Sequence, residues 1–438
     1  MQTQLTLEVQ RKTMMKVSWR LLPLIVVCYL VNYIDRTNVS FAALTMNKDL
    51  GLSSFMYGLG AGIFFLSYAV FEIPSNLILQ KVGARIWIAR IMITWGIISG
   101  LMAMATGPMS FLALRFALGA AEAGFFPGMI YYLTQWFPSA VRARAISTLY
   151  LAVPISNSIA SIISGAILAT MNGTLGLKGW QWVFIIEAIP AVVLAFVVLQ
   201  MMTERPAMAG WLQPDERIWL ENELEAERKQ VERAGHLSMW QAITDPRVLA
   251  LATIYFTSVT ASYGLVFFMP QIVKGLGLSN FATGWVTAIP YIVGTAGLIY
   301  FGISSDKYNE RRWHLIVSTG LSAVGYAFAA IFSHSYLAVI AMAIAAIGIY
   351  GSRPTFWPMP SAFLTGASAA VGMAFINSIG NLGGYVGPQI VGWIKDSTNS
   401  FEWALYFMAA CAALSTITAY FAKRSTGAPS GERQSLSA

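Results

Sequence analysis

The sequence has little charge and few residues that bind metals. Only 11% of its 438 residues are Asp, Glu, Lys or Arg, and 56% are hydrophobic. Soluble globular domains carry about 25% charged residues, so the composition predicts a polytopic membrane protein. The two cysteines, Cys28 and Cys411, fall in separate apolar runs, and the three histidines show no ligand spacing. These scarcities exclude a disulfide framework or a metal cluster, and we expect no cofactor.

Signals for export and for nucleotide chemistry are also missing. The segment from Met1 to Arg20 is polar and basic and has no signal-peptide core with a cleavage site, so the first apolar run is expected to act as an uncleaved insertion signal. No glycine-rich phosphate loop with its lysine and no nucleophile–base pair is visible in the sequence. ATP-driven transport and a membrane enzyme are therefore both disfavoured.

Long hydrophobic runs occupy most of the chain. A membrane-spanning helix needs about 20 apolar residues, and windows of this kind occur twelve times. The windows are 18–42, 56–79, 86–106, 110–136, 145–170, 181–202, 247–272, 280–303, 314–333, 336–364, 370–394 and 402–422.

The basic residues sort by side of the membrane. Of the 28 lysines and arginines, 20 fall in segments that would share a side with the N-terminus, four in the opposite loops and four in the spans. Lysine and arginine mark cytoplasmic loops, so both termini are predicted to be cytoplasmic. The net charge of +8 is thereby explained by topology, and a nucleic-acid partner is not expected.

The spans divide six and six around a polar connector. We predict a cytoplasmic tail over 1–17, a six-helix bundle over 18–202, a cytoplasmic linker over 203–245, a second bundle over 246–423 and a tail over 424–438. Within the linker, Pro214 followed by acidic residues is typical of a helix start, and the charged segment after it predicts a solvated or interfacial helix.

A repeated turn supports this division. The segments from Asn76 to Arg85 and from Gly302 to Arg312 are tight basic connections at corresponding places in the two halves. Duplication of a six-helix unit, with the site between the halves at mid-depth, is a known plan for secondary transporters.

These turns resemble the basic loop motif of the major facilitator superfamily, although Gln80 stands where the first motif usually has an acid. Longer strings resemble the anion:cation symporter family, in particular its bacterial tartrate, phthalate and hydroxyphenylacetate permeases. The strings are Tyr33 to Asn38, Glu72 to Asn76, Arg115 to Gly128, Trp136 to Pro138, Arg142 to Ala145 and Asn377 to Gly384. The resemblance implies an all-α fold of twelve transmembrane helices in two pseudo-symmetric bundles, in the bacterial inner membrane.

Eight ionisable residues lie within the predicted spans. They are Asp35, Arg36, Glu72, Arg90, Arg115, Glu122, Glu187 and Arg353. Charges within the membrane are costly and by default mark functional sites, although mutual structural pairing is the alternative for each.

Arg115 and Glu122 are seven residues apart, so they project from one helix face about 10 Å apart along the axis. An arginine and a carboxylate on one face suit an anion site beside a proton site, so we predict that Arg115 binds the substrate. Asp35 and Arg36 are about 100° apart on their helix and cannot face the same partner. The family resemblance implies that Asp35 and Glu122 carry the coupled proton and that Arg36 belongs to the substrate site. Permanent pairing of Glu122 with Arg36 or Arg115 is the competing interpretation.

Arg353 precedes three prolines that break a helix, and broken helices are tolerated where they line cavities. A second arginine opposite Arg36 would suit a dicarboxylate or a bulky aromatic acid; a lipid-facing or Glu-paired arginine is the equal alternative. The remaining predicted liners are uncharged or aromatic, namely Tyr33, Tyr68, Asn377, Asn381 and Trp357. By contrast, Glu72, Glu187 and Arg90 are interpreted as structural.

Together these patterns predict a monomeric secondary transporter, not an enzyme. It would import a small organic carboxylate by proton symport through alternating access of the two halves. A sugar-acid (aldonate or aldarate) symporter is the alternative substrate class. An efflux antiporter is disfavoured because the fifth span, around Pro154, lacks the Gly-Pro motif of the superfamily's antiporters.

Overall fold

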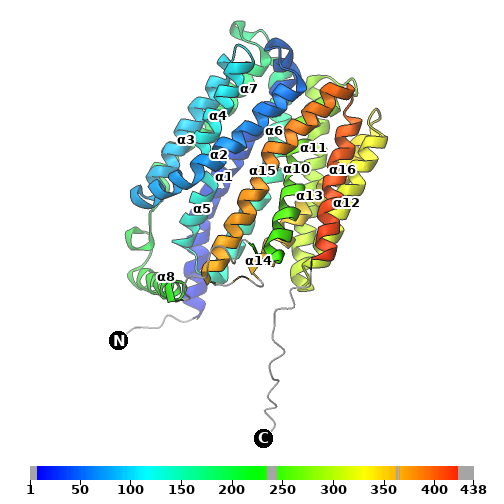
Figure 1. Ribbon diagram of the computed structural model, residues 1–438. Helices are drawn as coiled ribbons and strands as arrows, with labels where there is room; N and C mark the ends of the chain where they lie inside the picture. Colours follow the sequence, from blue (N-terminus) through cyan, green and yellow to red (C-terminus); the bar gives the residue numbers. More distant parts are fainter. Residues whose placement is uncertain (1–6, 234–243, 362–363, 365, 423–438) are drawn as a thin grey trace.

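The computed structural model describes residues 7–233, 244–361, 364 and 366–422. The predicted tail 424–438 lies outside these residues, as do 1–6 of the first tail and 234–243 of the linker. Every regular element in the described part of the chain is a helix. The first helix begins at Leu7 and the last helix ends at Phe421, and these two helix ends lie at the same end of the molecule (Figure 1), which we call the terminal side. The other end is the distal side.

The first half of the chain forms six spans. Their helices are α1 (Leu7–Asp49), α2 (Ser54–Val82), α3 (Ala84–Leu101) with the short η1 (Met102–Met104), α4 (Pro108–Glu122) followed by α5 (Phe125–Thr134), α6 (Ser139–Thr170) and α7 (Gly179–Met201). The connector carries α8 (Pro214–Arg233), which starts at the predicted proline. It docks on the first half through ion pairs Lys16–Glu216 (3.0 Å) and Arg142–Glu227 (2.8 Å).

The second half repeats the plan. Its helices are α10 (Pro246–Lys274), α11 (Asn280–Lys307), α12 (Arg312–Ile331), α13 (Leu337–Phe356) with the short α14 (Pro358–Ser361), α15 (Gly366–Thr398) and α16 (Glu402–Phe421). Eleven described segments are long and apolar enough to cross a membrane. The glycine-, serine- and asparagine-rich α15 has 33 residues and packs along α2 and α10, which completes twelve spans.

The fourth span differs from its prediction as one helix over 110–136. The chain breaks between α4 and α5, where Ala123 is extended (φ −55°, ψ 132°) and Gly124 is left-handed (φ +86°). A Cβ on Gly124 would also lie within van der Waals overlap of the Ser75 side chain, so only glycine fits this turn. The break leaves Glu122 at the last residue of α4.

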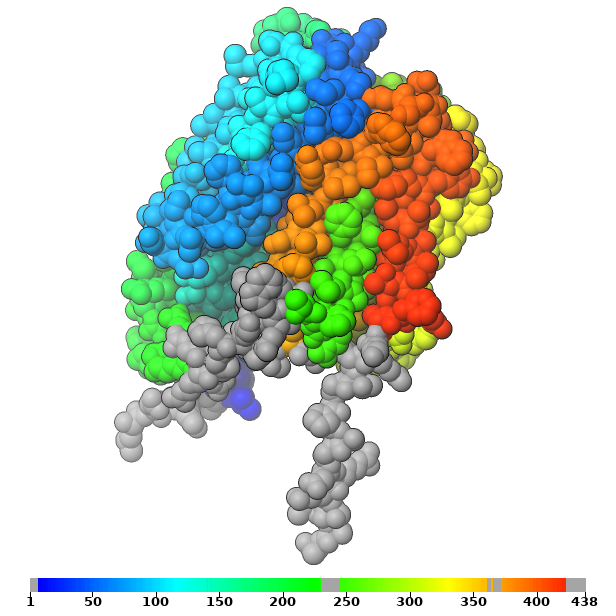
Figure 2. Space-filling model, in the orientation of Figure 1, coloured from blue at the N-terminus to red at the C-terminus, as the bar shows by residue number. Residues whose placement is uncertain are grey.

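The two halves touch on the distal side. The Asp396 carboxylate at the end of α15 accepts hydrogen bonds from the Ser54 (2.9 Å) and Phe55 (2.7 Å) amides, at the N-terminus of α2. Tyr57 donates to the Phe267 carbonyl (2.8 Å) across the same interface. Glycines allow backbone contact here, since a Cβ on Gly58 would overlap the Pro388 carbonyl group. Figure 2 shows α2 and α15 side by side at this end.

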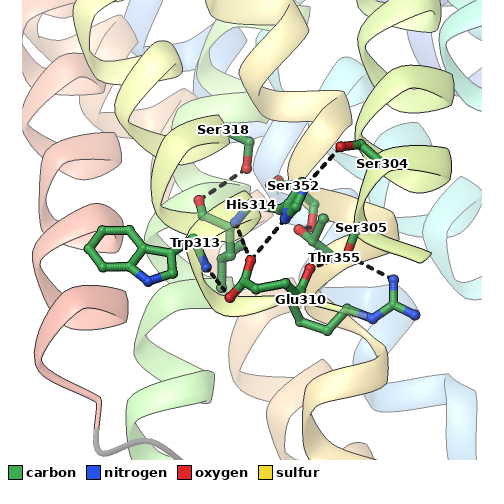
Figure 3. Close-up of polar contacts among 10 residues, drawn as sticks. Ser304, Ser305, Glu310, Trp313, His314, Ser318, Ser352 and Thr355 are labelled. Atoms are coloured by element: carbon green, nitrogen blue, oxygen red, sulfur yellow. Dashed lines mark hydrogen bonds and ion pairs between the residues drawn. The ribbon is translucent and has the colours of Figure 1, made fainter. Parts of the chain in front are cut away.

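Each repeated turn on the terminal side places a carboxylate at the start of the following helix. In the second half, Glu310 accepts from the amides of Trp313 (2.7 Å) and His314 (3.2 Å) and from the His314 ring (2.9 Å), as Figure 3 shows. Although burial opposes its charge, these donors hold the pKa of Glu310 below its ordinary value. In the first half, where Gln80 replaces the acid, Glu204 after α7 accepts from the Ala84 and Arg85 amides instead.

Candidate functional site

A cavity of about 1060 Å³, including space open to solvent, lies between the halves. Residues of α1, α2, α5 and α6 form one wall, and residues of α10, α11, α13 and α15 form the other. The distal contacts close it on one side. Such a cavity between repeated bundles is where a transported solute can bind.

Six of the predicted substrate-site residues line this cavity. They are Tyr33, Arg36, Tyr68, Arg353, Asn377 and Asn381. Three belong to each half of the chain, so the cavity brings together residues that are more than 270 positions apart in sequence. Both arginines are present, which gives each wall one guanidinium.

Arg36 is the charged centre of the first wall. Its guanidinium forms an ion pair with Glu122 and lies over the rings of Tyr33 (5.0 Å) and Tyr68 (5.5 Å). Arg36 is 8% exposed and Glu122 1%, so the pair is shielded from water, where its two charges interact strongly. The Arg36 Nε is buried and has no partner among the described residues.

Glu122 reaches Arg36 from the break in the fourth span. The last carbonyls of a helix carry partial negative charge, so the end of α4 is an unfavourable place for a carboxylate. Arg36 compensates this charge directly. The pair therefore joins α1 to α4 and couples the charge of Glu122 to a residue of the cavity wall.

Asp35 points away from the cavity, as its 100° offset from Arg36 requires. Its carboxylate accepts from Trp95 Nε1 (2.8 Å) and Ser99 Oγ (3.0 Å) on α3 and from Asn38 Nδ2 (3.3 Å) on its own helix. It is 1% exposed, and no cation lies within 4 Å of it in the described chain. Asp35 thus lies behind the cavity wall, held by neutral donors.

Arg115 and Trp357 also lie outside the cavity lining. Arg115 is fully buried and donates to the carbonyls of Gly60 (3.0 Å) and Ala61 (3.3 Å), which ties α4 to α2. Trp357 packs edge-on against Tyr255 (5.1 Å), which does line the cavity. In this conformation both residues support the walls from behind.

Arg353 is the charged residue of the second wall. Its guanidinium lies 5.2 Å from the Tyr255 ring, and Tyr255 is in turn stacked on Phe356. Over the described ranges, no carboxylate lies within ion-pair distance of Arg353. Arg353 therefore holds a positive charge at the cavity without a permanent counter-ion.

Several lining residues were not predicted from the sequence as site residues. They are mainly tyrosines of both halves, with one asparagine and one glutamate, namely Tyr29, Tyr150, Tyr255, Tyr263, Tyr350, Asn157 and Glu72. The Asn157 amide donates to the Tyr350 hydroxyl (2.9 Å) across the two halves. An asparagine within an apolar span was an available signal for Asn157, whereas tyrosines in spans are common at membrane interfaces.

Comparison with known proteins agrees with the geometry. The family model of the Major Facilitator Superfamily matches residues 25–279 and 251–437. The chain belongs to this superfamily. Two relatives from Agrobacterium vitis, each named "Putative tartrate transporter", are 50% and 48% identical over 94% and 96% of this chain and 94% and 93% of their own. A "Quinolone resistance transporter" from Acinetobacter baumannii is 41% identical, over 92% of this chain and 93% of its own.

Solved structures show the same fold. A bacterial homologue of the lysosomal transporter Spinster, in an inward-facing form, matches with a TM-score of 0.72 at 20% identity, over 94% of this chain and 96% of its own. The Escherichia coli xylose transporter XylE, inward open, matches with a TM-score of 0.75 at 13% identity, over 92% and 96%. The chain is thus a multi-pass membrane transporter of the major facilitator superfamily.

Proposed function

We propose that this protein imports a small hydroxylated dicarboxylate of the tartrate class by proton symport. The observation that carries the proposal is the pair of arginines, Arg36 and Arg353, on opposite walls of one cavity. Guanidinium groups bind carboxylates through two parallel hydrogen bonds. The cavity tyrosines and asparagines supply donors and acceptors for hydroxyl groups between the two charged ends. The names of the Agrobacterium relatives support the same substrate class.

Proton coupling follows from the Arg36–Glu122 ion pair. While Glu122 is ionised it competes with a substrate carboxylate for Arg36. Protonation of Glu122 removes that competitor, so Arg36 becomes available to the anion. Asp35, which lies on the same helix as Arg36 and accepts from neutral donors, is the second proposed proton carrier.

Alternating access of the two halves would carry the substrate across a bacterial inner membrane. With both termini cytoplasmic, the closed distal side faces outward, and this conformation is inward-facing. Opening the distal contacts and closing the terminal side would expose the same residues to the outside. We propose that the monomer performs this cycle.

The test is uptake by purified protein in liposomes. An inward acid gradient should drive accumulation of labelled tartrate-class dicarboxylates above equilibrium. Glu122→Gln should abolish accumulation while substrate exchange persists, because the neutral side chain leaves Arg36 free but carries no proton. Glu225→Gln on the exposed face of α8 is the matched control and should accumulate normally. Accumulation by Glu122→Gln at the wild-type level would contradict the coupling role.

The same liposome assay tests two alternatives to import of a tartrate-class dicarboxylate. Aldonates and aldarates test the sugar-acid class. The relative named for quinolone resistance makes efflux a second candidate, which outward-directed transport of a quinolone against a proton gradient would reveal. Gradient-driven uptake of no carboxylate would overturn the proposal.

A further inference from the structure

The first half buries a third carboxyl, in addition to Asp35 and Glu122, that the transport scheme above does not use. Glu187 on α7 is 3% exposed. Its Oε1 accepts a short hydrogen bond from Ser164 Oγ on α6 (2.6 Å), and its Oε2 is buried with no partner. An ionised carboxylate so far from water needs a cation or several donors; within the described ranges, Glu187 has one donor and no cation. The side chain is therefore suited to hold a proton.

The groups around Glu187 agree with this. α7 packs against α1, α3 and α6. Of their charged groups, Asp35 on α1 is the one with which Glu187 interacts electrostatically. Arg36 faces the cavity and Glu122 instead, and Arg90 on α3 is exposed and lies over the Trp87 ring. A charge on one of these carboxyls therefore opposes ionisation of the other.

The same region contains further unpaired polar groups. Asn32, one helical turn before Asp35 on α1, is fully buried, and both polar atoms of its amide lack a partner in the described chain. Buried polar groups in proteins are almost always paired with protein or water. Asn32 and Glu187 lie on the neighbouring helices α1 and α7, and each leaves buried polar atoms without a partner among the described residues.

A polar face of α6 leads from the cavity to Glu187. Asn157, which lines the cavity, is followed at helical spacing by Ser161 and Ser164. Ser161 Oγ donates to the Asn157 carbonyl (2.7 Å), and Ser164 Oγ donates to Glu187. These residues share one helix face over about 10 Å, and all three are buried. With water between them, these side chains would provide a polar route for a proton between the cavity and the carboxyl.

We propose that Glu187 is an additional proton-binding residue of the transport cycle, reached from the cavity along α6 and titrating together with Asp35. The proton would come from cavity water, bind the free Oε2 and return to water after the halves have exchanged access. This inference rests on the proposed proton symport.

Transport stoichiometry gives the first test. In liposomes, the number of protons per substrate can be obtained from the membrane potential at which net flux reverses. Glu187→Gln should lower that number by one with little change in substrate affinity, and Glu187→Asp should restore it at least in part. An unchanged proton number in Glu187→Gln would overturn the proposal.

Infrared difference spectroscopy gives a test that needs no transport. The carboxylic acid C=O band of Glu187, identified by its loss in Glu187→Gln, should titrate with pH in the wild-type protein. Ser164→Ala should move its midpoint to higher pH, because the charged form loses a donor. If Glu187→Gln fails to fold, the C=O band can instead be assigned to Glu187 as the band whose titration midpoint Ser164→Ala shifts. If the band does not change with pH, or if no such band is found, the inference about Glu187 is overturned. If the band titrates but an acid gradient drives no uptake, the proposed symport alone is overturned.

Discussion

Arg36 on α1 and Glu122 at the end of α4 form an ion pair that is almost completely shielded from water at the wall of the central cavity. The pair links a residue that can bind an anion to one that can bind a proton. When Glu122 is protonated, the Arg36 guanidinium loses its counter-ion and is left with an uncompensated buried charge. A substrate carboxylate can then compensate that charge, so proton and substrate are expected to act on the same guanidinium.

Arg36 tests the substrate half of this relationship. Arg36→Lys keeps the positive charge but loses the planar fork, so dicarboxylate binding should weaken by about 10- to 100-fold, the equivalent of a charged hydrogen bond of about 1.5 to 3 kcal/mol. Binding can be measured by calorimetry on purified protein. Arg228→Lys on α8 is the control. Affinity within twofold of wild type in Arg36→Lys would rule out two-point recognition by this guanidinium.

Arg353 tests the two-ended binding of the substrate. Arg353→Gln removes the unpaired charge of the second wall, so affinity for a dicarboxylate should fall by about tenfold or more, given the strength of charged hydrogen bonds. Affinity for the corresponding monocarboxylate should change much less. Competition binding with matched mono- and diacids measures the difference. Equal losses for both acids would mean that Arg353 does not contact the second carboxylate.

Asp396 tests the distal closure. Asp396→Ala removes the acceptor for the Ser54 and Phe55 amides, so the distal side should open more often. In a background of Cys28→Ser and Cys411→Ser, a Leu44→Cys probe should then react faster with an impermeant maleimide, since Leu44 lines a distal pocket.

The matched control for the distal closure is Asp49→Ala. Asp49 is also acidic and distal, but it pairs with Lys178 (2.8 Å) and Trp180 (2.8 Å) within the first half. Asp49→Ala should therefore leave the rate of maleimide labelling at the Leu44→Cys probe near that of the parent protein. Equal rates for Asp396→Ala and its parent would show that this contact does not hold the halves together.

Glu310 gives a stability prediction with a defined pH dependence. Glu310→Gln weakens the bonds to the start of α12, so unfolding should become easier by about 1 kcal/mol, the usual size of a helix-cap effect. Because the folded-state pKa of Glu310 is lowered, its contribution is complete above the unfolded pKa of about 4.3 and is lost as pH falls through the folded value. Thermal unfolding in detergent at neutral and acid pH measures this. If Glu310→Gln still unfolds at a lower temperature than the wild type in strong acid, where Glu310 is protonated, the loss of stability would come from packing and not from the charge.

Periodicity and apolar length predicted the twelve spans and the two halves, because each span is a continuous run of sequence. The break after Glu122 was missed, since Ala123 and Gly124 look like ordinary small residues until a neighbouring side chain excludes a Cβ. The Glu204 contact was also missed, because it joins residues about 120 positions apart.

The cavity could be predicted only in part for a similar reason. Charges such as Arg36 and Arg353 stand out in an apolar run, and the helical offset placed Asp35 on a different face from Arg36. The helix on which a side chain packs is not encoded locally, so Arg115 was assigned to the substrate site although it binds the α2 carbonyls. The cavity tyrosines were hidden among the many aromatic residues of the spans.

The distal interface between α2 and α15 is made in part by bare backbone, at Gly58 and likewise at Gly392 against Ser54. At these two points backbone meets backbone, so the helices can part there without withdrawing a side chain from a pocket. The Ser54 and Phe55 amides released from Asp396 would pass directly to water. Separation of the halves in each cycle would therefore break backbone contacts at Gly58 and Gly392, and the Phe65 ring would be the side chain that leaves its place against Gly384.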